Sequence, residues 1–294
     1  MEKTKYAGTW TAIVTPFNED GSLDEQSFRK LVQRQIEGGV TGIVPVGTTG
    51  ESPTLSLAEM TRLYEITVEE SKGKVLVMAG TGSNSTEHAV EYTKAAKEAG
   101  ADACLVVTPY YNKPTPAGLK AHFAAIADVG LPLFVYNIKG RTALNIETDL
   151  LMEMAEHPNI IGVKEASGDI NQIKEVIEKR PEGFVVLSGD DGMTLDLMKA
   201  GGDGIVSVAS NIVPEKVVQL VKYGLSGQMD KAEELNGELS DMFKKIFIET
   251  NPVPTKYCLY KMGLCKLAYR LPMCEPTDAS KEVLNKMISD YGLI

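Results

Sequence analysis

Short runs of apolar residues alternate along the chain with longer segments in which apolar residues recur every three to four positions. Each short run is interpreted as a buried parallel strand, because a strand that is covered on both faces lacks the polar alternation of an exposed sheet. Each longer segment has the period of an amphipathic helix. The predicted strands are residues 10–15, 43–46, 75–79, 103–107, 133–136, 160–164, 184–187 and 204–208.

A predicted helix follows each strand, and the strand–helix unit returns after roughly 20 to 33 residues. This regular alternation predicts an α/β fold of the (β/α)8 TIM barrel type. A doubly wound sheet is the alternative, which is less favoured because no glycine-rich fingerprint follows the first strand. Only helical patterns remain after Pro214, so we predict a catalytic barrel over residues 1–213 and a C-terminal helical extension packed on it over residues 214–294.

The predicted strand at residues 160–164 ends on Lys164, and a lysine is almost never fully buried unless it is paired. One explanation is a partly desolvated amine whose lowered pKa lets it attack a carbonyl as a neutral nucleophile. The structural explanations are that the side chain extends to water or pairs with Glu165. The active site of a TIM barrel lies at the carboxyl ends of its strands. The residues that follow the other strands therefore help to decide between a nucleophilic and a structural role for Lys164.

Hydroxyl groups, phenols and one arginine follow the other strands. The set comprises Thr48, Thr49, Glu51, Tyr110, Tyr111, Asn112, Tyr136, Asn137, Arg141, Gly189, Asp190 and Asp191, with Val206 and Ser207 inside the last strand. A lysine that forms a Schiff base with a keto acid needs a group that both gives and takes a proton, and a tyrosine linked through a threonine hydroxyl to a second tyrosine could supply it. The glycine turn at residues 47–50 could hold one carboxylate, and Arg141 could hold a second.

Each of these features also has a structural explanation. The turn could be only a turn, the tyrosines could cover apolar surface or fill the barrel, and Arg141 could form a surface ion pair. Asp190 and Asp191 are interpreted as a helix N-cap pair rather than as catalytic groups.

Composition argues against several classes of partner. The chain of 294 residues has a net charge of −10, which does not favour binding to nucleic acid or to an anionic membrane. The four cysteines lack CxxC spacing, and the strand ends carry no acidic or histidine cluster suited to a metal. The first residues lack an apolar signal region, so we expect a cytoplasmic protein.

Several motifs in register carry a resemblance over nearly the whole chain. They are GTTGES at 47–52, AGTGSNST at 79–86, TPYYNKP at 108–114, YNIKGRT at 136–142, GVKEASGD at 162–169, SGDD at 188–191, GIVSVASN at 204–211 and ETNPVPTK at 249–256. With these motifs the chain resembles the dihydrodipicolinate synthase and N-acetylneuraminate lyase family of class I pyruvate-dependent aldolases.

The resemblance implies a role for most of the strand-end residues. Lys164 would form the Schiff base with pyruvate, and Tyr136 would give and take protons. Thr48 and Tyr111 would complete the proton relay, Tyr111 reaching it from a neighbouring subunit, which implies a homodimer or homotetramer. It also implies no metal and no organic cofactor, only the covalent imine of pyruvate on Lys164.

For the substrates, the resemblance implies that Thr49 and the backbone of Val206 bind pyruvate. Arg141 would hold the carboxylate of the aldehyde, and Gly189 would line the pocket. The motifs GTTGES and NPVPTK and the arginine of YNIKGRT are similar to the synthase branch rather than to the sialic-acid lyases. That branch condenses pyruvate with L-aspartate 4-semialdehyde to 4-hydroxy-tetrahydrodipicolinate, in the synthesis of lysine and diaminopimelate.

Two departures from the branch matter. Lys139 stands where the branch usually has proline, which leaves the identity of the aldehyde open. Met60 and His88 stand where lysine-sensitive members have a histidine and a glutamate, although Asn84 and Tyr110 remain. We therefore expect weak or absent inhibition by lysine, and a micromolar inhibition constant would contradict this.

Two other functions are consistent with parts of the pattern. An aldolase or dehydratase for 2-keto-3-deoxy sugar acids would share Lys164 and Tyr136 but take a different second substrate. A barrel that has lost catalysis and binds or regulates a partner is less favoured, because the lysine, both relay tyrosines and Thr48 are all present.

Overall fold

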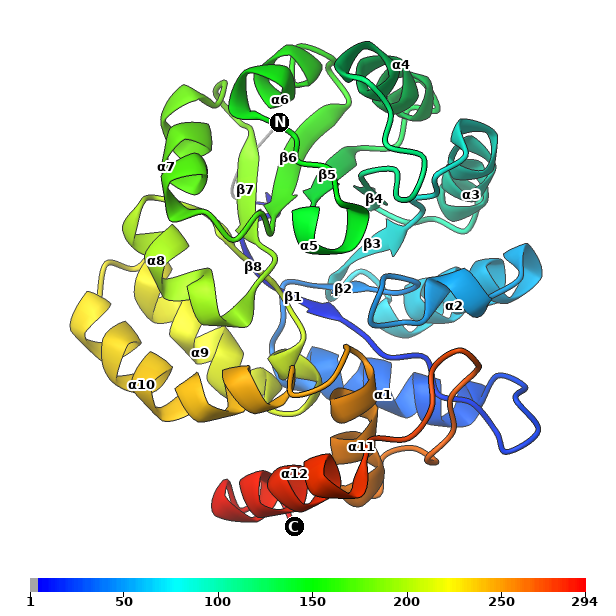
Figure 1. Ribbon diagram of the computed structural model, residues 1–294, viewed down its shortest axis with the longest axis vertical. Coiled ribbons are helices and arrows are strands. Elements are labelled where there is room, and N and C mark those ends of the chain that lie inside the picture. The colour runs from blue at the N-terminus through cyan, green and yellow to red at the C-terminus, as the bar shows by residue number, and fades with distance from the viewer. Residues whose placement is uncertain (1–4) are drawn as a thin grey trace.

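Eight short apolar segments pair side by side as parallel strands and close into a barrel in chain order (Figure 1). The computed structural model describes residues 5–294. The closed parallel barrel confirms the predicted TIM-barrel fold and excludes the doubly wound sheet. The strands are β1 (Gly8–Ala12), β2 (Gly42–Val44), β3 (Leu76–Gly80), β4 (Ala103–Val107), β5 (Leu133–Asn137), β6 (Ile160–Glu165), β7 (Val185–Ser188) and β8 (Gly204–Ser207).

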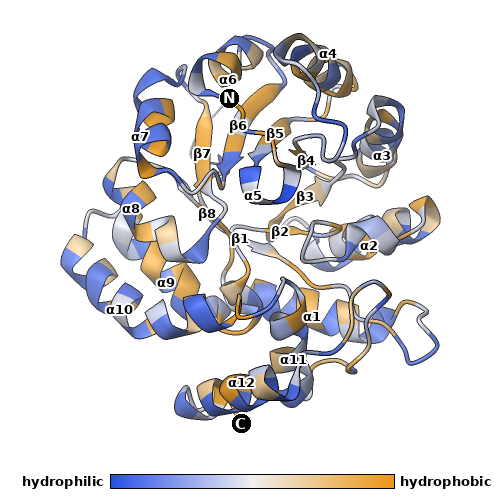
Figure 2. Ribbon diagram, viewed as in Figure 1, coloured by the Kyte–Doolittle hydropathy of each residue, from blue (hydrophilic) through white to orange (hydrophobic). Residues whose placement is uncertain are grey.

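Helices surround the barrel and cover the outer face of its strands (Figure 1). Figure 2 shows β6 and β7 in the hydrophobic colour, whereas much of α7 and α10 is hydrophilic. The helices are α1 (Glu25–Glu37), α2 (Leu57–Ser71), α3 (Thr86–Glu98), α4 (Pro116–Ala127), α5 (Lys139–Thr142), α6 (Thr148–Met154), α7 (Ile170–Lys179), α8 (Thr194–Lys199), α9 (Pro214–Leu225), α10 (Met229–Lys245), α11 (Val253–Lys261) and α12 (Asp278–Asp290).

Side chains of the strands divide between two hydrophobic clusters, because successive residues of a strand point to opposite faces. The larger cluster lies between the strands and the helices and includes Val135 and Val163. The smaller cluster fills the barrel interior and includes Trp10, Phe134 and Tyr136. The inner cluster includes Phe134 and Tyr136 of β5 and Ile161 of β6, whereas Ile160 belongs to the outer cluster, because the pairing of β5 with β6 shifts register between Leu133 and Phe134. Beyond that shift Tyr136 pairs with Lys164, whose side chain lies on the inner face with the site.

The first strand differs from its predicted range. It ends at Ala12 rather than at residue 15, because the backbone N–H of Val14 donates to the side chain of Asn211 and not to a neighbouring strand. The short helix α5, which no apolar period predicts, follows β5 directly and carries Arg141.

Helix α9 opens the predicted C-terminal extension. It packs against β1 and β8, while α10 packs against α8 and α9, and α11 packs against α12. The extension therefore rests directly on the barrel. The division of the chain into residues 1–213 and 214–294 stays a prediction.

Candidate active site

Lys164 and Tyr136 lie side by side at the carboxyl ends of β6 and β5. The two residues are partners in the strand register, and both side chains point into the barrel. Lys164 is only 5% exposed, and its Nζ lies 4.1 Å from the centroid of the Tyr136 ring. The parallel pairing thus places a buried amine over the face of a tyrosine ring.

Burial dominates the electrostatics of both residues. It lowers the pKa of Lys164 to about 7, with Arg141 adding to the effect and Asp191 opposing it. Burial also raises the pKa of the Tyr136 phenol above its ordinary value. At neutral pH the site therefore holds a partly neutral amine beside a protonated phenol, as a nucleophile and a proton donor must be.

Glu165 does not pair with Lys164, although the two residues are adjacent. Its side chain points to the opposite face of β6, where it accepts hydrogen bonds from the side chain of Asn137 and from the backbone N–H of Ser167. The structural explanation that relied on a Lys164–Glu165 pair is therefore wrong, because neighbouring residues of a strand face opposite ways.

The turn after β2 carries Thr48 and Thr49 to the pocket that contains Lys164. The Thr49 hydroxyl is buried and accepts a hydrogen bond from Nδ2 of Asn251 at 2.9 Å. The turn also packs tightly on β3, since a Cβ on Gly80 would lie 2.3 Å from the carbonyl oxygen of Val46. Glycine at position 80 is what allows this close approach.

Arg141 and Gly189 line the same pocket as Lys164. Arg141 is exposed on α5 and donates from Nη2 to the carbonyl of Asn251 at 3.3 Å, so its side chain is held at the mouth of the pocket. A Cβ on Gly189 would lie 3.0 Å from Cε of Lys164, so this glycine leaves room for the lysine side chain. Lys139 is exposed and is not among the residues that line the pocket.

Two predicted site residues lie outside the pocket lining. Val206 is buried in the barrel interior, and Val208 lines the pocket in its place. Tyr111 is 91% exposed, with a left-handed φ of 74°. A single chain therefore brings Thr48, Thr49, Tyr136, Arg141, Lys164 and Gly189 together but leaves the Tyr111 phenol on the surface.

The two aspartates after β7 have different roles. Asp190 caps the short 3-10 helix η3 (Asp191–Met193) by accepting from the backbone N–H of Gly192, as the N-cap interpretation predicts. Asp191 is not a cap, because its buried carboxylate accepts from the hydroxyl of Ser207 and from the backbone N–H of Val208. Its charge favours the protonated form of Lys164.

Sequence reasoning missed the contribution of the segment between α10 and α11. Asn251 and Phe247 line the pocket from this segment. Asn251 lies in the motif ETNPVPTK at 249–256, so the motif was a usable signal, but periodicity alone could not show that the segment reaches the barrel mouth.

A second pocket adjoins the first, and Thr48 and Arg141 line both. Met60, His88 and Tyr110 lie in its wall, so the residues considered for lysine inhibition do share one site. Weak or absent inhibition by lysine stays a prediction.

Within residues 5–294, no group of three or more His, Cys, Asp or Glu side chains is arranged to hold a metal ion. In the same range no helix is long and apolar enough to cross a membrane.

Comparisons with known proteins agree with this geometry. A 4-hydroxy-tetrahydrodipicolinate synthase from Chlorobium phaeobacteroides is 48% identical over 99% of each chain. One from Maridesulfovibrio salexigens is 46% identical over 98% of this chain and 99% of its own. The crystal structure of dihydrodipicolinate synthase from Aquifex aeolicus superimposes with a TM-score of 0.96 at 40% identity, covering 98% of this chain and 99% of that one.

The model of the dihydrodipicolinate synthetase family matches residues 5–291, which is nearly the whole chain. The family match, the full-length relatives and the closed barrel all agree with the resemblance seen in the motifs. The chain therefore belongs to the dihydrodipicolinate synthetase family.

Proposed function

We propose that the protein is a Schiff-base-forming lyase that condenses pyruvate with L-aspartate 4-semialdehyde to 4-hydroxy-tetrahydrodipicolinate. The observation that carries the proposal is the buried Lys164 amine, 4.1 Å from the Tyr136 ring and with a pKa lowered to about 7. Full-length relatives that are 44–48% identical carry the name of this synthase, which supports the same substrates.

The chemistry begins with carbonyl addition. The neutral Lys164 amine attacks the keto carbon of pyruvate, and loss of water gives an iminium ion. Removal of a proton from the methyl carbon gives an enamine, whose methylene carbon attacks the aldehyde carbon and forms the new carbon–carbon bond. The aldehyde oxygen takes up a proton and becomes the hydroxyl group of the product, and the iminium ion is restored. The amino group of the aldehyde substrate then attacks the imine carbon and displaces Lys164, which closes the ring. No metal or organic cofactor takes part in these steps.

Tyr136 is placed to move the protons. Its phenol lies beside the Lys164 amine and is kept protonated by burial, so it can protonate the departing hydroxyl of the carbinolamine and take a proton back later. We propose that Thr48, which lines the same pocket, links Tyr136 to Tyr111 of a neighbouring subunit. The exposure of Tyr111 on its own chain is consistent with that role.

The carboxylate groups of the two substrates need hydrogen-bond donors in the pocket. We propose that Thr49 and the backbone of Val206 bind pyruvate, that Arg141 binds the carboxylate of the aldehyde, and that Gly189 lines the space between. Arg141 suits its role because its guanidinium sits at the pocket mouth, and its planar fork matches a carboxylate. The localisation that we propose for this biosynthetic enzyme is the cytoplasm.

Borohydride reduction in the presence of pyruvate tests the Schiff base. We expect an irreversible adduct of pyruvate mass on the peptide that contains Lys164, and none in the variant Lys164→Met. Methionine is unbranched like lysine and only one heavy atom shorter, so this control keeps most of the packing. A wild-type protein without an adduct would show that the proposed chemistry is wrong.

A panel of aldehydes tests the second substrate. We expect kcat/KM with aspartate semialdehyde to exceed that of sugar-derived aldehydes by more than about tenfold, roughly 1.4 kcal/mol of transition-state discrimination. The opposite preference would instead support an aldolase for 2-keto-3-deoxy sugar acids. Exposed Lys139 at the start of α5 is the residue to vary in that case.

A further inference from the structure

The turn that carries Thr48 and Thr49 has an unfavourable backbone at both ends. Val46 before it and Glu51 after it have left-handed φ values of 59° and 54°. Non-glycine residues rarely adopt this conformation, and a β-branched residue such as valine adopts it least readily. Such a turn persists only where surrounding contacts determine its shape.

The carboxylate of Glu51 provides one such contact. Glu51 is 3% exposed, and Oε1 lies 2.5 Å from Nζ of Lys256 on α11. Lys256 is fully buried, and its amine lies 4.5 Å from the centroid of the Phe17 ring and 4.9 Å from that of Tyr269. The pair therefore joins the end of the turn to the C-terminal extension across a sequence separation of 205 residues.

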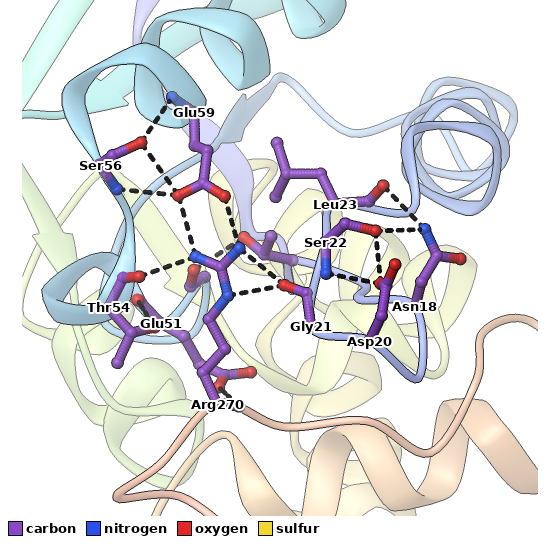
Figure 3. A network of polar contacts seen from close by, with 12 residues as sticks. Asn18, Asp20, Gly21, Ser22, Leu23, Glu51, Thr54, Ser56, Glu59 and Arg270 are labelled. Carbon is purple, nitrogen blue, oxygen red and sulfur yellow. Dashed lines mark hydrogen bonds and ion pairs between the residues drawn. The ribbon is translucent and has the colours of Figure 1, made fainter.

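Arg270, on the segment between α11 and α12, also contacts the end of the turn (Figure 3). Its backbone N–H donates to Oε2 of Glu51, and its guanidinium donates to the carbonyls of Gly21 and Thr54 and to the carboxylate of Glu59. Together with the hydrogen bond from Asn251 to Thr49, these contacts mean that the C-terminal extension holds the turn at two points.

A purely structural role would not require charge at this place. Replacing a buried ion pair by apolar residues of similar volume is often neutral for stability, because both charges lose their hydration when they are buried. What an ion pair adds is a defined geometry, since the carboxylate must lie where the amine is. Here that geometry determines the end of the turn three residues from Thr48.

From these observations we infer that the Lys256–Glu51 pair is a positioning device for catalysis, through which the C-terminal extension holds Thr48 and Thr49 in their reactive arrangement. Neither residue lines the pocket. They act through the turn, and the C-terminal extension is thereby part of the active site. The inference rests on the proposed function, because it assigns Thr48 to the proton relay and Thr49 to pyruvate.

The test compares two variants that each remove the cation of a buried pair. Lys256→Met removes the cation that holds the turn. Arg180→Met removes one partner of Asp203, at the opposite end of the barrel strands, where Asp203 immediately precedes β8. Each variant removes one ion pair from a buried carboxylate, so both should lower the melting temperature.

Two measurements follow at a temperature at which both variants are folded. The first is the pyruvate concentration that half-saturates borohydride trapping, together with kcat. The second is amide hydrogen exchange of residues 47–55 by mass spectrometry, which does not depend on any activity. We expect Lys256→Met to raise the half-saturating concentration at least about tenfold, since small displacements of positioning groups have effects of this size, and to speed exchange in the turn. Arg180→Met should change neither.

Glu51→Gln provides a second variant if Lys256→Met does not fold, because glutamine keeps the shape of the side chain and one acceptor oxygen. A higher half-saturating pyruvate concentration and faster exchange in this variant would support the inference. Unchanged exchange and unchanged trapping in the folded Lys256 or Glu51 variant would overturn it. A wild-type protein that fails to trap pyruvate would contradict the proposed function instead, and the exchange data would still decide whether the pair holds the turn.

Discussion

At the scale of single residues, the protonation state of Lys164 determines the rate of the proposed imine formation. Burial lowers the pKa of its amine to about 7, so about a tenth of the amine is neutral at pH 6 and about nine tenths at pH 8. The rate of imine formation with pyruvate should therefore rise with pH through this range and level off above it. Pre-steady-state mixing followed by a borohydride quench measures the rate. A midpoint near 10.5, the ordinary value for lysine, would contradict the prediction.

The absence of a side chain at Gly189 is a second property of a single residue. A Cβ at this position would lie 2.7 Å from Cβ of Ala166 and 3.0 Å from Cε of Lys164, so Gly189→Ala should displace the lysine side chain. We expect kcat/KM to fall at least about tenfold and stability to fall by about 1–3 kcal/mol, as for other overpacked sites. Steady-state kinetics and urea unfolding measure the two effects.

Gly237→Ala is the matched control for this substitution. Gly237 lies within α10, and nothing stands within 4 Å of a Cβ built there. The change should leave kcat/KM unaltered and stabilise the helix by about 0.5–1 kcal/mol. Full activity in Gly189→Ala would show that Lys164 tolerates the methyl group.

At the scale of elements, the ends of β5 and β6 are joined by more than their backbone ladder. Asn137 on β5 donates to the buried Glu165 carboxylate on β6, and its Oδ1 accepts from the backbone N–H of Ile146. These bonds lie one residue beyond the register pair of Tyr136 and Lys164. The two strands that carry Tyr136 and Lys164 are thus held at a constant separation.

Asn137→Ala should therefore destabilise the protein by about 2–4 kcal/mol, because it leaves buried polar groups without partners. Equilibrium urea unfolding gives the loss. Asn145→Ala is the comparison, since Asn145 bonds to Asn137 but is less buried and its hydrogen bonds are more easily replaced by water. If the two variants lost equal free energy of unfolding, the buried contact between the strands would contribute no more to stability than the more exposed one.

At the scale of the whole molecule, the position of Tyr111 predicts an assembly. A phenol that is 91% exposed cannot serve the pocket of its own chain, so a shared site requires a second copy. Light scattering at micromolar concentration should therefore give the mass of a dimer or tetramer. A monomer that retains full activity would contradict the shared relay.

Mixing two inactive variants tests the shared site directly. Tyr111→Phe lacks the proposed relay phenol, and Lys164→Met lacks the proposed nucleophile. If Tyr111 acts across the subunit boundary, hybrid assemblies regain a complete site, with Lys164 from one variant and Tyr111 from the other. We expect activity to reappear on mixing after dissociation and reassembly. No recovery in demonstrated hybrids would place both residues in the same subunit's site.

Local patterns in the sequence predicted much of the fold and the residues at the centre of the candidate site. Apolar runs and helical periods are properties of neighbouring residues, so they located the strands, and the number of units predicted the barrel. Once the barrel was expected, the rule that sites lie at the carboxyl ends of strands selected Lys164 and Tyr136. The structure places both side chains in one pocket.

The sequence by itself thus determined the strand–helix rhythm, the barrel, and the lysine at the end of β6 beside a tyrosine on β5. The tertiary structure alone decided which distant groups support them. Asn251 and Lys256 contact Thr49 and Glu51 across separations of 202 and 205 residues. No periodicity records such contacts, because they depend on how the C-terminal helices pack on the closed barrel. The lowered pKa of Lys164 has the same origin, since desolvation arises only when the surrounding strands and loops exclude water.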